Sequence, residues 1–168
     1  MWPTGSKPRT RPMGAAYFYH LTRRPLEATL PVLLKKSLSA GWRVAVRGTD
    51  AARLAWLDEK LWLGDEAGFL PHGLAGGPHD VDQPVLLTTA AEAPNGATCV
   101  MTVDGAEVAA DEVKRLDRVC ILFDGNDAAA LDRARDQWRD LTAAGCAAQY
   151  WSEDSGRWEK KQDRPAAE

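Results

Sequence analysis

Residues 118–123 (Arg-Val-Cys-Ile-Leu-Phe) form a run that is apolar at every position after the first, and this run restricts the fold most strongly. A strand with one face in water alternates apolar and polar residues, whereas a short continuous apolar run is typical of a strand buried on both faces. Such strands lie inside sheets that helices cover on both sides. The run therefore predicts a buried strand of an α/β sheet.

Further short apolar runs alternate with stretches of helical periodicity along the chain. Strands are predicted at residues 15–20, 43–48, 84–89 and 98–103, and helices end near Gly41 and Gly64 and span about 111–116 and 127–144. Segments 147–153 and 157–161 flank Asp154-Ser155-Gly156, which predicts a hairpin. This order predicts an α/β fold: a single three-layer α/β/α domain with a largely parallel central sheet and a C-terminal β-hairpin.

The length of 168 residues suits one domain with a substantial core. Residues 1–14 are rich in Pro, Arg and Lys, and we expect them to be a disordered basic leader. The domain is predicted to span residues 15–161, and residues 162–168 are expected to be a frayed tail.

Charge and cysteine usage limit the partners. The net charge of −3 argues against a protein that binds nucleic acid with its whole surface, so we expect no direct nucleic-acid partner. No apolar run approaches the roughly 18–20 residues of a membrane helix, so no membrane partner is expected. Cys99, Cys120 and Cys146 are widely spaced, which predicts buried thiols and a cytoplasmic location.

The segment that follows the second predicted helix carries large apolar residues on a Gly- and Pro-rich connector. Trp62 and Phe69 are the largest of them. Such side chains either pack over the core or form an exposed patch that another chain covers. We favour the patch.

The helix at about 127–144 predicts a second site. Arg135 and Arg139 lie four residues apart beside Trp138, along one edge of the core-facing stripe. An indole flanked by two guanidinium groups suits a short acidic peptide with an apolar end. The alternative is a solvated helix face, because Asp132, Asp136 and Asp140 could pair with the arginines.

Asp104 and Asp124 support the enzyme alternative. Each ends an apolar run and precedes a glycine, and carboxylates at this edge of a parallel sheet often hold Mg²⁺. A metal-dependent hydrolase or phosphotransferase could use this pair. The competing interpretation is that Asp-Gly makes tight turns and that Asn126 or Asp127 caps the next helix. We favour the turns, since no nucleophile and base accompany the pair.

No other pattern predicts a cofactor. His72, His79, Asp80 and Asp82 fit no helical or hairpin metal site, and the glycines at 73, 76 and 77 lack a phosphate-loop context. We therefore expect neither a metal nor a cofactor.

Several short motifs of the chain occur in the order found in one family. Taken together, the chain resembles the chi subunit of the bacterial DNA polymerase III holoenzyme over residues 15–160. The motifs are Phe18-Tyr19 followed by Leu21, Gly41-Trp42-Arg43-Val44, Leu57-Asp58-Glu59 with Leu61-Trp62, Phe69 with Pro71-His72, Pro84-Val85, and the helix end at residues 135–145.

The resemblance implies a non-enzymatic replisome adaptor with a nucleotide-binding-like sheet and no known nucleotide chemistry. It implies binding of the acidic C-terminal tail of the single-stranded-DNA-binding protein at Arg135, Trp138 and Arg139. It also implies that the psi subunit, which leads to the clamp-loader complex, or a repair helicase docks at Trp62 and Phe69. The C-terminal hairpin and the basic leader extend past the shortest family members.

Overall fold

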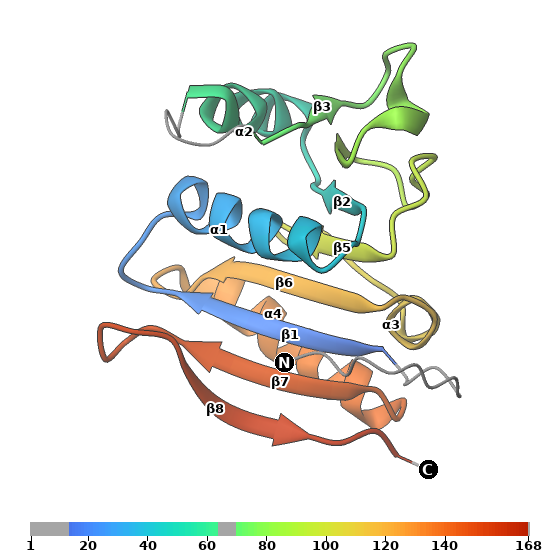
Figure 1. Cartoon of the computed structure of the whole chain (residues 1–168). Helices are drawn as coiled ribbons and strands as arrows, with labels where there is room; N and C mark the ends of the chain where they lie inside the picture. The colour runs from blue at the N-terminus through green and yellow to red at the C-terminus, as the bar shows by residue number, and fades with distance from the viewer. Residues whose placement is uncertain (1–13, 64–69, 168) are drawn as a thin grey trace.

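An eight-stranded sheet crosses the protein in the order β3-β4-β2-β5-β6-β1-β7-β8 (Figure 1). The computed structural model describes residues 14–63 and 70–167. Its strands are β1 (Ala15–Leu21), β2 (Val44–Arg47), β3 (Gly73–Leu74), β4 (Val85–Thr88), β5 (Cys99–Thr102), β6 (Arg118–Asp124), β7 (Ala147–Ser152) and β8 (Glu159–Arg164). Its helices are α1 (Leu26–Ser39), α2 (Ala51–Leu63), α3 (Ala110–Arg115) and α4 (Ala128–Ala143), with a 3-10 turn η1 (Asp80–Asp82).

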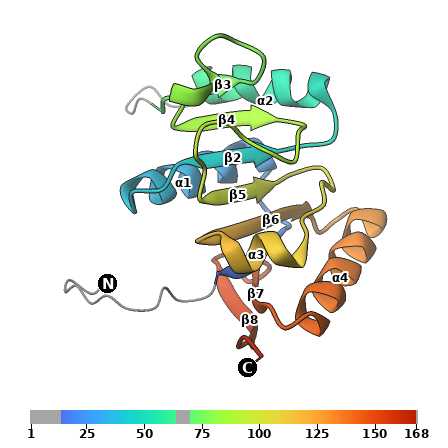
Figure 2. The same ribbon diagram turned by 90° about the vertical axis from the view of Figure 1, so that its right-hand side faces the viewer.

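The predicted three-layer α/β/α fold is confirmed. Neighbouring strands pair in parallel except for β7 and β8, which form the predicted antiparallel C-terminal pair. Helices α1 and α2 lie on one face of the sheet, and α3 and α4 lie on the other (Figures 1 and 2). Within the described ranges, no helix is long and apolar enough to cross a lipid bilayer.

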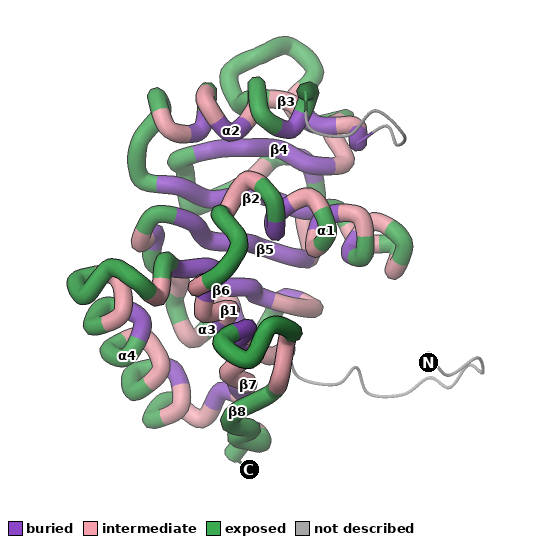
Figure 3. The backbone as a smooth tube through the Cα atoms, turned by 90° about the vertical axis from the view of Figure 1, so that its left-hand side faces the viewer, coloured by how far each residue is buried: buried purple, intermediate pink, exposed green. Residues whose placement is uncertain are grey.

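Strand β6 has the two-sided burial that its apolar run predicts. Cys120 and Leu122 belong to the core cluster under α1 and α2, whereas Val119, Ile121 and Phe123 belong to the cluster under α4. Burial is concentrated in the central strands, and β8 is largely exposed (Figure 3). Because both faces of β6 are covered, the strand has no solvent-facing position between Val119 and Phe123.

Two local features differ from the expectations. Strand β3 lies in the segment that was expected to be an irregular loop, and it pairs with β4 at the edge of the sheet. Strand β8 continues to Arg164, beyond residue 161, and the Ala167 amide donates a hydrogen bond to the Gly145 carbonyl at 3.1 Å.

The connections after β1 and β6 create an opening at the carboxyl edge of the sheet. These two strands are neighbours, but β1 leads into α1 on one face and β6 leads into α4 on the other. Ligands of open α/β sheets bind where adjacent connections diverge in this way. The loops after β1 and β6 are therefore the first place to look for a site.

A buried arginine fastens two of the loops next to this edge. The Arg47 guanidinium donates to both carboxylate oxygens of Glu112, at 2.7 Å and 3.1 Å, and to the carbonyls of Ala91 and Glu107. The side chain of Arg47 is 7% exposed. Removing one partner of a buried pair leaves the other charge unsatisfied, and this typically costs about 3–5 kcal/mol.

We predict that Arg47→Met lowers the free energy of unfolding by about 3 kcal/mol, because Glu112 and two carbonyls lose their donor. The hydrogen bond from Arg47 holds the pKa of Glu112 below its ordinary value of 4.5. The pair therefore contributes fully above that pH and its contribution is lost as the pH falls further. Urea unfolding of wild type and Glu112→Gln should show a stability difference that is constant above about pH 5 and shrinks as the pH falls below that value. A difference that is independent of pH would contradict this role.

Candidate functional site

A cavity of about 630 Å³ lies between α4 and the β7–β8 hairpin. It brings together the three residues that the sequence singled out on α4. The lining residues are Arg135, Trp138 and Arg139 from α4, His20 from β1, Tyr150 and Ser152 from β7, Asp154 from the turn, and Lys161 and Gln162 from β8.

The Trp138 indole is half-buried and held on the core side by aromatic contacts. Its ring centroid lies 5.3 Å from that of Phe18 and 6.0 Å from that of Tyr150, both in edge-to-face geometry. Alternation along β1 and β7 directs Phe18 and Tyr150 to the face that α4 covers. The indole is thus fixed in orientation while part of it lines the cavity.

The two arginines stand at the open side of the cavity and are mostly exposed. Arg135 lies 3.9 Å from Asp132, and Arg139 contacts Asp136. These pairs agree with the alternative of a solvated helix face. Exposed pairs of this kind contribute only about 0–1 kcal/mol, so an incoming carboxylate can replace the aspartates.

His20 and Tyr150 form the inner wall. The Tyr150 hydroxyl lies 3.0 Å from His20 Nδ1. Burial raises the pKa of Tyr150, although the positive charge of Arg135 acts in the opposite sense. The His20 ring also stacks on Phe123 at 5.2 Å. Gly125 makes room for it, because a Cβ there would lie 1.8 Å from the ring.

Sequence reasoning missed most of this wall. His20 lies on β1, far from α4 in the chain, whereas Tyr150, Ser152, Asp154 and Gln162 come from the β7–β8 hairpin that follows α4. Alternation along β7 could have shown that Tyr150 shares a face with Ala148, which packs against the same core cluster. Only the pairing of β1 with β7 places His20 beside them.

A second exposed surface lies at the end of α2. Trp62 is 51% exposed and Leu63 is 74% exposed, as the patch interpretation requires. Phe69, the other residue predicted there, lies outside the described residues. The Trp62 ring centroid is 4.2 Å from that of His72.

His72 is buried and ties the following segment to α2. Its Nδ1 lies 2.7 Å from the Leu70 carbonyl, and its Nε2 lies 3.2 Å from the Asp58 carbonyl and 3.3 Å from Asp58 Oδ1. Both ring nitrogens therefore face oxygen atoms of the chain. This packing accounts for the spacing of Asp58, Trp62 and His72 in structural terms.

We predict that His72→Ala lowers the free energy of unfolding by about 2–3 kcal/mol, because it removes buried hydrogen bonds and the ring contact with Trp62. Urea denaturation is the measurement, and His79→Ala is the matched control because His79 is exposed. Equal losses in the two variants would refute a positioning role for His72.

The carboxyl edge of the sheet holds another cavity, of about 680 Å³, lined by Asp104 and Asp124. The Asp104 carboxylate accepts two hydrogen bonds from Arg53, at 3.1 Å and 3.2 Å. Asp124 accepts from the Asn126 amide at 2.9 Å, and Asp127 caps α4. In the part of the chain that the structure describes, no group of three or more His, Cys, Asp or Glu side chains could hold a metal ion. The arrangement matches the turn-and-cap interpretation.

The turn after β1 holds an internal anion. The backbone amides of Thr22, Arg23 and Arg24 all donate to Glu153 Oε2, each at 3.1 Å. Successive amides of this kind, just before a helix, form the usual seat for a phosphate in α/β folds. Here the carboxylate of Glu153 accepts these hydrogen bonds in place of a phosphate, and Glu153 is only 3% exposed.

Comparison with known proteins identifies the family. The sequence model of the family described as "DNA polymerase III chi subunit, HolC" matches residues 13–149. The chain belongs to this family. A protein of Rickettsia prowazekii (strain Madrid E), "Probable DNA polymerase III subunit chi", is 22% identical over 111 residues, which cover 63% of this chain and 67% of that protein.

Membership of the chi family assigns the chain to DNA replication, in association with the DNA polymerase III complex. The matched range includes Trp62, Arg135, Trp138 and Arg139. It ends inside β7, so β8 and the hairpin turn lie beyond it.

Proposed function

We propose that the protein is a non-enzymatic adaptor that binds the acidic C-terminal tail of the single-stranded-DNA-binding protein and links it to the clamp-loader complex. The observation that carries this proposal is the cavity in which Arg135, Trp138 and Arg139 meet. The Glu153 carboxylate in the phosphate seat and the pairing of Asp104 with Arg53 also favour an adaptor without its own catalytic activity.

The tail ends in an apolar residue with a free carboxylate, preceded by acidic residues. The apolar end would pack on the Trp138 indole, and Arg139 and Arg135 would pair with the carboxylates. Each charge-assisted contact at this exposed position is worth at most about 1–3 kcal/mol, so one tail binds weakly and in a salt-sensitive manner. An oligomeric partner with several tails gains avidity from multivalency.

We predict that Arg139→Ala weakens binding of a tail peptide about tenfold, because a charged contact is lost. Removing the terminal phenylalanine from the peptide should abolish binding, because the indole loses its occupant. Calorimetry with the full chain measures both effects. Arg133→Ala is the matched control, since Arg133 lies on the same helix but lines the cavity of Asp104 and Asp124. Unchanged affinity for Arg139→Ala or for the shortened peptide would refute the assignment.

The second surface would hold the psi subunit, another clamp-loader component, or a repair helicase. Trp62 and Leu63 expose apolar area at the end of α2. Exposed apolar area of this kind commonly marks a protein-binding surface. Phe69 is proposed as part of the same surface.

We predict that Trp62→Ala and Phe69→Ala lose this second partner in a pull-down while tail binding stays unchanged, since the tail cavity is lined by other elements. Leu63→Ser is a second variant whose folding should be unaffected, because the side chain is 74% exposed. Val32→Ser, at a 46% exposed apolar position on α1, is the control. Retention of the partner by Trp62→Ala, Phe69→Ala and Leu63→Ser would place the docking surface elsewhere.

A further inference from the structure

We infer that the β7–β8 hairpin supplies a second cationic wall of the tail cavity, in which Lys161 binds a carboxylate of the acidic peptide opposite Arg135 and Arg139. This inference rests on the proposed function and names a further specificity-determining residue for it. Lys161 lies on β8, beyond residue 149, where the family match ends.

A bulge in β8 directs Lys161 into the cavity. Tyr150 pairs with Gln162 and Trp151 pairs with Lys160, so Lys161 is the extra residue between two rungs of the ladder. In a regular strand, successive side chains point to opposite faces. Here Lys161 and Gln162 both line the same cavity. Re-aiming a side chain is the characteristic effect of a bulge, and bulges are common beside functional sites.

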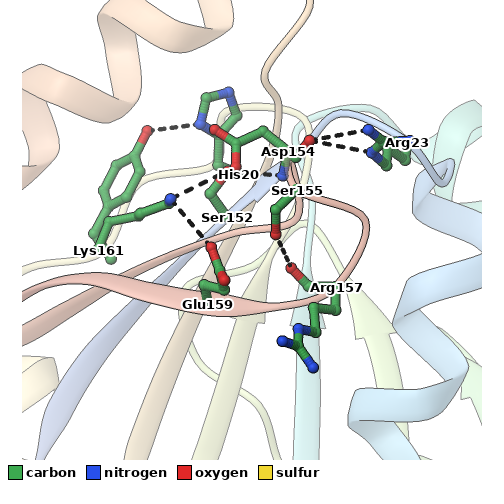
Figure 4. Close-up of polar contacts among 9 residues, drawn as sticks. His20, Arg23, Ser152, Asp154, Ser155, Arg157, Glu159 and Lys161 are labelled. Carbon is green, nitrogen blue, oxygen red and sulfur yellow. Dashed lines mark hydrogen bonds and ion pairs between the residues drawn. The ribbon is translucent and has the colours of Figure 1, made fainter.

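The charges around Lys161 indicate what it recognises. Its Nζ lies 3.3 Å from Glu159 Oε1 and 3.7 Å from Asp154 Oδ1 (Figure 4). The hydrogen bond to Glu159 raises the pKa of Lys161, so the ammonium is charged at neutral pH. Asp154 is the acidic residue among those that line the cavity, and it would repel an acidic peptide if Lys161 did not neutralise it.

The hairpin turn is fastened in place, so the wall is pre-positioned. Glu153 binds three amides of the turn after β1. The Arg23 guanidinium donates to the Asp154 carbonyl at 3.0 Å and 3.3 Å, and the Asp154 amide donates to Ser152 Oγ at 3.2 Å. These contacts use the backbone of Asp154 and leave its carboxylate facing Lys161. A rigid wall lowers the entropic cost of binding a flexible tail.

The test is a double-mutant cycle on the full chain, with an acidic synthetic peptide that ends in phenylalanine and a free carboxyl group, at low ionic strength. Lys161→Ala should weaken binding about fivefold, because a cation is lost and Asp154 is left unpaired. Asp154→Asn alone should leave affinity equal or higher. In the double variant, the part of the loss caused by the unpaired Asp154 should disappear, and the part caused by the missing contact between Lys161 and the peptide carboxylate should remain. Lys160→Ala is the matched control, because Lys160 pairs with Asp163 at 2.9 Å instead of lining the cavity.

A second peptide, with its internal acidic residues replaced by asparagine, separates recognition from a merely structural role. Wild type and Lys161→Ala should bind this peptide with equal affinity, and their thermal unfolding midpoints should agree. If Arg139→Ala loses binding but Lys161→Ala does not, or if Asp154→Asn weakens binding, the hairpin inference fails while the proposed function stands. If wild type does not bind the acidic peptide, the proposed function itself fails.

Discussion

One buried carboxylate, that of Glu153, holds together the two loops on which both cavities depend. Glu153 is only 3% exposed and accepts three backbone hydrogen bonds, which stabilise a charge that would otherwise be costly to bury. It joins the turn after β1 to the hairpin of β7 and β8, which lies next to β1 and ends the sheet. The same contact therefore occupies the backbone amides that could bind an external anion, and it holds the hairpin beside the cavity.

This arrangement is consistent with the proposed role of a nucleotide-binding type of sheet as a docking module. The carboxyl edge has the geometry in which α/β enzymes hold ligands, and a cavity is present there. Its amides bind Glu153, and one of its two candidate carboxylates binds Arg53. The cavity with cations around an aromatic residue lies instead between α4 and the hairpin. The side chains that suit an acidic peptide thus lie near the β7–β8 edge of the sheet and not at its carboxyl edge.

The sequence predicted what local patterns encode. The apolar run at β6, the Asp127 cap of α4 and the meeting of Arg135, Trp138 and Arg139 follow from periodicity and capping alone. His20, the bulge at Lys161 and the role of Glu153 did not follow. His20 and Glu153 depend on contacts between segments that lie about 130 residues apart in the chain, as the contacts of His20 with Tyr150 and of Thr22 with Glu153 show, whereas the bulge depends on the register between β7 and β8. Register across such distances has no local signal.

The sheet also sets the distance between the two proposed surfaces. Helix α2 packs near the β3–β4 edge, whereas the tail cavity lies at the β7–β8 edge (Figure 1). Five strand spacings separate β4 from β7, or roughly 25 Å at the usual spacing between strands. The two surfaces lie on different elements near opposite edges of the sheet, so substitutions at one should not change binding at the other. Under the proposed function, one small domain would hold two proteins at once, with the sheet as the spacer between them.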